Sequence, residues 1–462
     1  MSEPLPPRVL ARSESVFVLA GATVAQNCYG TGVVDGAVLS DAFAALVEMY
    51  PLLGGRIHLL RKGFEVRFEH GKQPEATFFD VSDADVGNYL TARKSALPVG
   101  RVCALRVYRS SEKFRVTFLL HHAIADADAA LKYHQDLWML YTERMHVTKG
   151  LVEQRVTRTP HPIPASSESL LRARGYTEPA SRRMMDLRPA YRGRGWIWTA
   201  FRPRRAERGR VHLSVEQTDK LLEIGRANGV TLHGLVSAAL VLAERELSGK
   251  AVLPVAISSY VNLRSRITPP VAAAEGTNVL GIAEMILSAN QSSDALDLAR
   301  QVVADISDGL KTSRIHQTAF VPEGDIRRVL SMIGRYFLLV ALGGLVPTFT
   351  AIQITNWGRI PRFETPDGLH INDFRCGVEL HAVVAFLAAR GVAVVDGHIY
   401  FVSSYNGRLS IDFTKLATRK NNARRVEQIL QSEVEKLLPT TVSDDQANPH
   451  PNQALRPQET PK

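Results

Sequence analysis

The stretch Lys113–Asp126 reads KFRVTFLLHHAIAD, and it sets the expectations for the whole chain. Its apolar side chains recur at every second position, at Phe114, Val116, Phe118 and Leu120. This period of two predicts a strand with one buried face. From Asp126 to about Met145 the apolar residues change to helical spacing. We therefore expect a strand, two adjacent histidines in a short turn, and then a helix.

The two histidines are expected to point in different directions. If the alternation persists, His122 lies on the apolar face with Leu120, and His121 lies on the opposite face. Imidazole exchanges a proton near neutral pH, so a histidine facing a cavity suits general-base catalysis. Asp126 is expected to orient the motif through an arginine or through backbone amides. In the alternative interpretation, Asp126 or Asp128 only caps the helix and the histidines are satisfied polar residues.

Chain length and periodicity predict two domains. A chain of 462 residues is too long for one ordinary core. Hydrophobic residues make up 45% and charged residues 22%, which is typical of folded globular proteins rather than disordered ones. Strand and helix signals occur in both halves and fade between them. We expect an N-terminal subdomain at 1–160, a basic linker at 161–210, a C-terminal subdomain at 211–440 and a disordered tail at 441–462.

The cysteines and the N-terminal residues favour a reducing compartment. Cys28, Cys103 and Cys376 are far apart and lack CxxC spacing, which argues against disulfides and zinc. No histidine or carboxylate cluster follows the motif at ligand spacing, so no metal is expected. Residues 1–17 contain no apolar stretch typical of a signal peptide, and we expect a cytoplasmic protein. The apolar run 336–346 predicts a buried helix, or alternatively a lip in peripheral contact with a membrane.

Positive charge is concentrated in one part of the chain. The net charge is +10, and Arg182–Arg210 holds a large share of it, interleaved with aromatic residues. A solvated linker is the favoured interpretation. Docking of an acidic carrier protein or an anionic lipid surface is the alternative. No nucleic-acid fold signature accompanies the segment, so we expect no nucleic-acid partner.

The His121–Asp126 run resembles the HHxxxD signature of the CoA-dependent acyltransferase superfamily. This superfamily includes chloramphenicol acetyltransferase, plant alcohol acyltransferases and peptide-synthetase condensation domains. Within it, the chain is most similar to the mycobacterial polyketide-associated acyltransferases. The similarity extends over most of residues 13–435 and includes further segments: SESVF at 13–17, DAFAALVEMYPLL at 41–53, YVNLRSRITPPVAAAEGTNVLG at 260–281, and the late strands between 378 and 413.

The resemblance implies an α/β (α+β) fold of two chloramphenicol-acetyltransferase-like subdomains. Each is a mixed sheet with flanking helices, and an active-site tunnel lies between them. His122 would be the general base and His121 would support the loop. Asp126 would be structural, with Arg264 as its partner. Asn356 and Trp357 would line the tunnel.

The resemblance also implies the reaction. An acyl group would pass from acyl-CoA or a carrier-protein thioester to the hydroxyl of a lipid or polyketide alcohol, with no bound cofactor. We expect a monomer, and the basic segment 182–210 is the candidate docking site for an acyl carrier protein or polyketide synthase if it is more than a linker. Alternatives are an amide-forming or epimerising enzyme of the same fold, and a non-catalytic scaffold that binds a carrier protein or lipid.

Three features depart from the superfamily pattern. Ala127 stands where glycine is usual, and the DFGWG motif is absent, as it is in the polyketide-associated group. Relative to the type member of that group, residues 326–346 resemble an insertion. Because glycine is favoured where the backbone approaches closely, Ala127 would narrow the site or shift the helix start. A small residue is retained, so we expect activity to survive.

Overall fold

The structure is a computed structural model, and the described part of the chain is discontinuous. It comprises residues 5–69, 71, 73–87, 97–151, 158–179, 196–198, 206–249, 254–287, 294–321, 345–347, 349–379, 395–416 and 423–438. The predicted tail 441–462 lies outside these ranges. So do most of the basic segment 182–210 and most of the apolar run 336–346.

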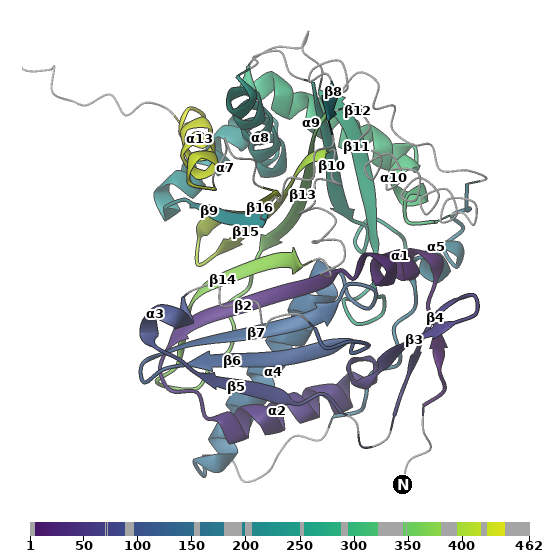
Figure 1. The fold of residues 1–462 in the computed structure, drawn as a ribbon, viewed down its shortest axis with the longest axis vertical. Helices are drawn as coiled ribbons and strands as arrows, with labels where there is room; N and C mark the ends of the chain where they lie inside the picture. Colours follow the sequence, from purple (N-terminus) through teal and green to yellow (C-terminus); the bar gives the residue numbers. More distant parts are fainter. Residues whose placement is uncertain are drawn as a thin grey trace, which may run out of the picture.

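The first half of the molecule is built on a mixed sheet (Figure 1). Its strand order is β14-β2-β7-β6-β5, and only the pair β5 and β6 is parallel. The strands are β2 (Thr23–Thr31), β5 (Ala76–Asp80), β6 (Cys103–Arg109), β7 (Lys113–His121) and β14 (His370–Glu379). The strand predicted from the alternation at 113–122 is therefore β7, at the centre of this sheet.

Two long helices cover one face of the first sheet. They are α2 (Gly36–Met49) and α4 (Ala127–Thr148), and they pack against each other as well as against the strands. Phe114, Phe118 and Leu120 of β7 are fully buried against them. The alternation in the sequence thus reflects a real core face, which fixes the register of the strand that leads to the histidines.

The second half is built on a larger mixed sheet with the order β11-β10-β13-β15-β16-β9. The central strands β10, β13 and β15 run parallel, and the outer pairs are antiparallel. The strands are β9 (Ala206–His212), β10 (Val255–Asn262), β11 (Leu280–Leu287), β13 (Phe349–Arg359), β15 (Val395–Tyr405) and β16 (Arg408–Leu416). Two mixed sheets with flanking helices confirm the predicted fold class.

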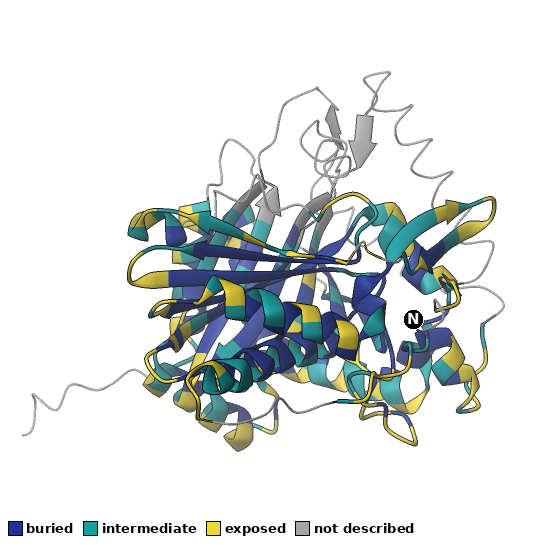
Figure 2. Cartoon of the chain, turned by 90° about the horizontal axis from the view of Figure 1, so that it is seen from below, coloured by how far each residue is buried: buried dark blue, intermediate teal, exposed yellow. Residues whose placement is uncertain are grey.

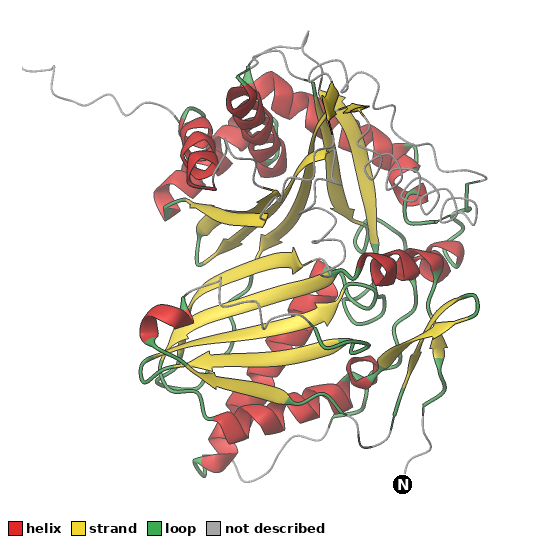
Figure 3. Ribbon diagram, in the orientation of Figure 1, coloured by secondary structure: helices red, strands yellow, loops and turns green. Residues whose placement is uncertain are grey.

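Four helices pack on the outer face of the second sheet (Figure 3). They are α7 (Val215–Ala227), α8 (Leu232–Ser248), α9 (Ala295–Lys311) and α13 (Ala423–Glu435). Burial is deepest in the strands and on the inward sides of the helices, whose outer sides are exposed (Figure 2). Among the described helices none is by itself long and apolar enough to span a bilayer; α7 and α8 reach that length only together, across a bend of 105°.

Shorter elements connect the two halves or lie at their edges. They are β1 (Arg8–Val9), β3 (Arg56–Leu60), β4 (Gly63–Arg67), β8 (Trp196–Trp198), β12 (Leu345–Pro347), α1 (Arg12–Ala20), η1 (Pro51–Gly54), α3 (Asp83–Val86), α5 (Ser167–Arg172) and α10 (Arg314–Gln317). Of the run 336–346, for which a buried helix is predicted, the structure describes residues 345 and 346, and these belong to the strand β12. Helix α1 lies between the two large sheets (Figure 1).

The predicted boundary at 211–440 needs a correction, because β14 belongs to the first sheet. It pairs antiparallel with β2 from His370↔Thr31 to Glu379↔Thr23. Phe374 and Cys376 face the first hydrophobic core. The linker boundary also shifts, since β9 already begins at Ala206. The second half of the chain therefore supplies the strand β14 to the first sheet, where β14 forms antiparallel hydrogen bonds with β2.

Gly30 of β2 has no room for a side chain. A Cβ atom there would lie 2.2 Å from Phe114 Cζ and 2.3 Å from the carbonyl oxygen of His370. We expect Gly30→Ala to lower the free energy of unfolding by about 1–3 kcal/mol through overpacking. Urea denaturation measures this. Gly87→Ala is the matched control, because the nearest atom to its Cβ is 3.9 Å away, and an equal loss in both variants would contradict the packing argument.

Candidate active site

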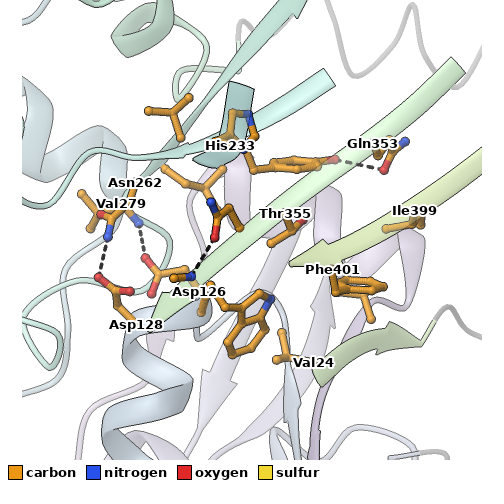
Figure 4. Close-up of a pocket in the computed structure, with 18 of the residues that line it drawn as sticks. Val24, Asp126, Asp128, His233, Asn262, Val279, Gln353, Thr355, Ile399 and Phe401 are labelled. Atoms are coloured by element: carbon orange, nitrogen blue, oxygen red, sulfur yellow. Dashed lines mark hydrogen bonds between the residues drawn. The ribbon is translucent and has the colours of Figure 1, made fainter. Parts of the chain in front are cut away.

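A cavity of about 860 Å³ lies between the two halves (Figure 4). The first half supplies α1, the turn after β7 and the start of α4, while the second half supplies α8, α9 and strands β10, β13 and β15. His122, Asp126, Asn356 and Trp357 all line it, so the structure brings these candidate residues together. His121 is not part of the lining. The two histidines thus differ in their relation to the cavity.

His122 is held in the turn that follows β7. The strand ends at His121, and the backbone amide of His122 donates to the carbonyl of Ala22 at 2.8 Å. Phe17 of α1 stacks on the imidazole, with the ring centroids 4.1 Å apart and the planes 11° from parallel. The ring is therefore fixed by backbone and aromatic contacts rather than by the strand register alone.

The charge state of His122 is set by its surroundings. Burial lowers the pKa of His122, and this effect is opposed by hydrogen bonds and by the nearby Asp126 carboxylate. An imidazole with a lowered pKa is neutral at pH 7 and carries a free lone pair. One ring nitrogen, Nδ1, lies 3.0 Å from the side-chain oxygen of Asn278. The motif therefore places a neutral imidazole of fixed orientation in the cavity.

His121 serves the turn. Its Nδ1 atom accepts a hydrogen bond from the amide of Ala123 at 3.1 Å. Burial, and then the proximity of His122, lowers the pKa of His121 to about 4. Its position and bonding suit support of the loop, the part that the resemblance implies for it.

Asp126 combines the two roles that the sequence left open. As N-cap of α4, its side chain accepts from the amide of Ala129 at 2.9 Å. The same carboxylate receives a bidentate pair from Arg264, with Nε at 3.1 Å from Oδ2 and Nη2 at 2.9 Å from both oxygens. Arg264 also donates to the carbonyls of Ala272 and Gly276. Both side chains are buried, so the charges compensate each other inside the protein.

Ala127 occupies the first position of α4 and lines the cavity. Its backbone dihedral φ is not among the positive values of the described residues. Glycine is therefore not required there for conformational reasons. The departure from the superfamily pattern leaves the helix start at the residue directly after Asp126.

Other polar side chains line the same cavity as His122. Asp128 accepts from Asn262 at 2.6 Å, and Tyr260 donates to Gln353 at 3.3 Å. Burial, and then Asp126, raises the pKa of Asp128. Between these groups the lining is apolar along α1 and α9, at Val16, Phe17, Ala20, Val303, Ile306 and Leu310. The cavity thus offers both polar and hydrocarbon surface.

Asn356 and Trp357 lie at the bulge of β13. The side-chain oxygen of Asn356 accepts from the amide of Gly358 at 2.8 Å, which stabilises the bulge. Trp357 is buried against Phe374 of β14, with ring centroids 6.4 Å apart. Trp357 therefore joins the cavity wall to the core of the first half.

Two residues of the site were not identified from the sequence. Asn278 stands in the block that carries the resemblance, but nothing in its spacing marked it as a contact of His122. His233, at the second position of α8, is a second histidine in the cavity lining. Its Nε2 atom is hydrogen bonded to Ser259 at 3.1 Å, and burial lowers the pKa of His233 to about 4. A lone histidine in an apolar helix gives no sequence signal for such a position.

Within the described ranges, no group of three His, Cys, Asp or Glu side chains lies close enough to hold a metal ion. The acid and base groups of the cavity are instead paired with amides, with arginine or with hydroxyls. Proton transfer by imidazole is accordingly the chemistry that these residues support most directly.

Comparison with known proteins gives matches of two kinds. Residues 202–414 match the protein family described as phthiocerol/phthiodiolone dimycocerosyl transferase C-terminus. A protein of that name from Mycobacterium bovis (strain BCG / Pasteur 1173P2) is 27% identical over 381 residues, which cover 80% of this chain and 85% of the relative. The same name applies to a protein of Mycobacterium sp. (strain JLS), 26% identical over 85% of this chain and 92% of its own length.

Solved structures share the architecture. Polyketide synthase associated protein 5 from Mycobacterium tuberculosis is 23% identical and superposes with a TM-score of 0.68 over 94% of this chain and 99% of its own. At this level of identity the likeness concerns the fold. Together with the sequence matches, it confirms the resemblance that was predicted from the motif and its companion segments.

Proposed function

We propose, on the premise that this chain is an acyltransferase related to the phthiocerol/phthiodiolone dimycocerosyl transferases, that it transfers an acyl group from a thioester to a hydroxyl. The donor is acyl-CoA or an acyl carrier-protein thioester, and the acceptor is a lipid or polyketide alcohol. The observation that carries the proposal is a neutral imidazole, held by a stack on one ring face and a hydrogen bond at Nδ1, in a partly apolar cavity between the halves.

The reaction needs one base and no covalent intermediate. His122 removes the proton of the acceptor hydroxyl as its oxygen attacks the thioester carbonyl. When the tetrahedral intermediate collapses, the C–S bond breaks and the imidazolium returns the proton to the thiolate. The ester and a free thiol leave, and His122 is neutral again. The apolar walls of α1 and α9 support the proposal of hydrocarbon-bearing substrates.

A labelled-thioester assay tests the proposal. The pure protein is given a labelled acyl-CoA with matched long-chain alcohols and amines, and products are identified by mass spectrometry. We expect labelled ester and free thiol in equal amounts. Amide as the main product would favour the amide-forming alternative, and absence of both products together with retained ligand binding would favour the non-catalytic scaffold.

The pH dependence follows from the lowered pKa of His122. Because a base acts in its neutral form, activity is expected to be level between pH 7 and 8. It should decline only below the ordinary histidine value of about 6.5, where protonation of His122 becomes possible. The measurement is kcat/KM between pH 5 and 8. A profile centred above pH 7 would contradict a base with a lowered pKa.

A carrier-protein donor is expected to depend on the basic segment. Arg210 itself pairs with Asp373 at 2.8 Å and is engaged within the fold. Charge reversal of Arg182, Arg183 and Arg188 should weaken transfer from a carrier protein more than tenfold and transfer from CoA much less, because carrier proteins are acidic. Equal effects on both donors would argue against docking on this segment.

A further inference from the structure

Three consecutive residues of the second half hold the histidine motif of the first. The carbonyl of Thr277 accepts from the amide of Asp126 at 2.8 Å, and the amide of Val279 donates to the Asp126 carboxylate at 2.9 Å. Between them, Asn278 contacts His122 twice. All three residues are buried. We call residues 277–279, which directly precede β11, the clamp.

The clamp is itself anchored. The hydroxyl of Thr277 donates to Glu14 of α1 at 2.6 Å, and its amide donates to the carbonyl of Ala165 at 3.1 Å. The hydroxyl of Ser167 donates to the carbonyl of Asn278. Several elements therefore fix the position of the Asn278 side chain before any substrate arrives.

The contacts of Asn278 determine which way its amide faces. Its nitrogen Nδ2 donates to the backbone carbonyl of His122 at 2.6 Å. Its oxygen Oδ1 therefore points at the imidazole Nδ1, 3.0 Å away. An amide oxygen only accepts hydrogen bonds, so Nδ1 must carry the hydrogen. A neutral imidazole has one N–H, which leaves Nε2 with the lone pair.

We propose that Asn278 is a positioning residue that selects the Nδ1-protonated tautomer of His122 and leaves Nε2 as the basic atom. In the opposite tautomer, the lone pairs of Nδ1 and Oδ1 would face each other across a buried contact, and the hydrogen bond would be lost. Because Asn278 belongs to the second half, its hydrogen bonds to His122 form only when the two halves are packed together. The assignment of Nε2 as the catalytic atom rests on the proposed function; the tautomer does not.

Nuclear magnetic resonance reads the tautomer directly. The full chain is labelled with ¹⁵N-histidine, and the ring signals of His122 are identified by their absence in His122→Gln. In the wild type we expect a protonated Nδ1 and an unprotonated Nε2 at pH 7.5. In Asn278→Ala the Nδ1-protonated fraction should fall clearly, with kcat lower by roughly tenfold to a hundredfold and KM changed less than threefold.

Two further variants separate positioning from general loss of structure. Asn278→Asp keeps an acceptor beside Nδ1 and adds a negative charge, so the acid limb of the kcat/KM profile should move to higher pH. Asn262→Ala is the matched comparison, because it removes another asparagine bond between the halves, to Asp128. It should leave the His122 tautomer unchanged.

A wild-type His122 protonated at Nε2 overturns the inference, and so does an unchanged tautomer in a folded Asn278→Ala. The wild-type spectrum decides by itself where Asn278→Ala does not fold. These spectra report the tautomer of His122 whether or not the protein has enzymatic activity. A protein that forms no ester but shows the expected tautomers would refute the proposed function and leave this inference standing.

Discussion

Replacing His122 with alanine is expected to lower turnover by roughly two to four orders of magnitude while the protein stays folded. Among the described residues that line the cavity, the His122 imidazole combines a lowered pKa with a stack on Phe17 at one ring face and a hydrogen bond to Asn278 at the ring edge. The measurement is kcat with saturating thioester and alcohol, together with a thermal unfolding curve.

His233→Gln is the matched comparison for that experiment. His233 lines the same cavity and is also neutral at pH 7, but its Nε2 atom is occupied by Ser259. We expect this variant to lose less than about tenfold, a small effect beside the loss of a general base. A larger loss for His233→Gln than for His122→Ala would transfer the role of base to His233.

Replacing Arg264 with methionine is expected to destabilise the protein by about 3–5 kcal/mol, because Asp126 would remain as a buried charge without a partner. The carboxylate would keep only its bonds to the amides of Ala129 and Val279. Turnover should fall as well, since Asp126 holds the turn that carries His122. Urea denaturation measures the free energy of unfolding.

The control is the exposed pair of Arg300 and Asp297 on α9, with an N–O distance of 2.7 Å. Arg300→Met should cost at most about 1 kcal/mol, because solvent screens both charges. The double variant Asp126→Asn with Arg264→Met should lose less free energy of unfolding than the two single variants together. Each single variant leaves one buried charge without its partner, whereas the double variant removes both charges. Additive losses would show that the two side chains do not depend on each other.

Sequence patterns were most informative where apolar side chains recur regularly on one face of an element. The alternation in β7 and the helical spacing after Asp126, in α4, each gave the correct type of element. By contrast β2 does not alternate: buried polar Gln26 and Asn27 interrupt its apolar residues, although both of its faces are buried, as they are in β7. A strand without alternation has no periodic signal, and its polar residues look like a loop.

The histidine motif illustrates how far the site could be predicted. The phase of β7 favoured His122 over His121 for the cavity, and His122 does line it. The reason differs in part, because the strand stops at His121 and the turn contacts set the ring. The Arg264 contact with Asp126 spans 138 positions and came from the resemblance. Asn278 and His233 depend on the packing of two halves, which no local pattern encodes.

The exchange of β14 between the halves has a consequence for biosynthesis. Residues 370–379 emerge from the ribosome long after β2, yet they complete the sheet beside it. Until then, the edge of β2 that later pairs with β14 is exposed in the nascent chain and can form hydrogen bonds with a non-native strand. The N-terminal half expressed alone would end in the same condition, so truncated products should aggregate, and folding of the turn that carries His122 should finish only after residues 370–379 have left the ribosome.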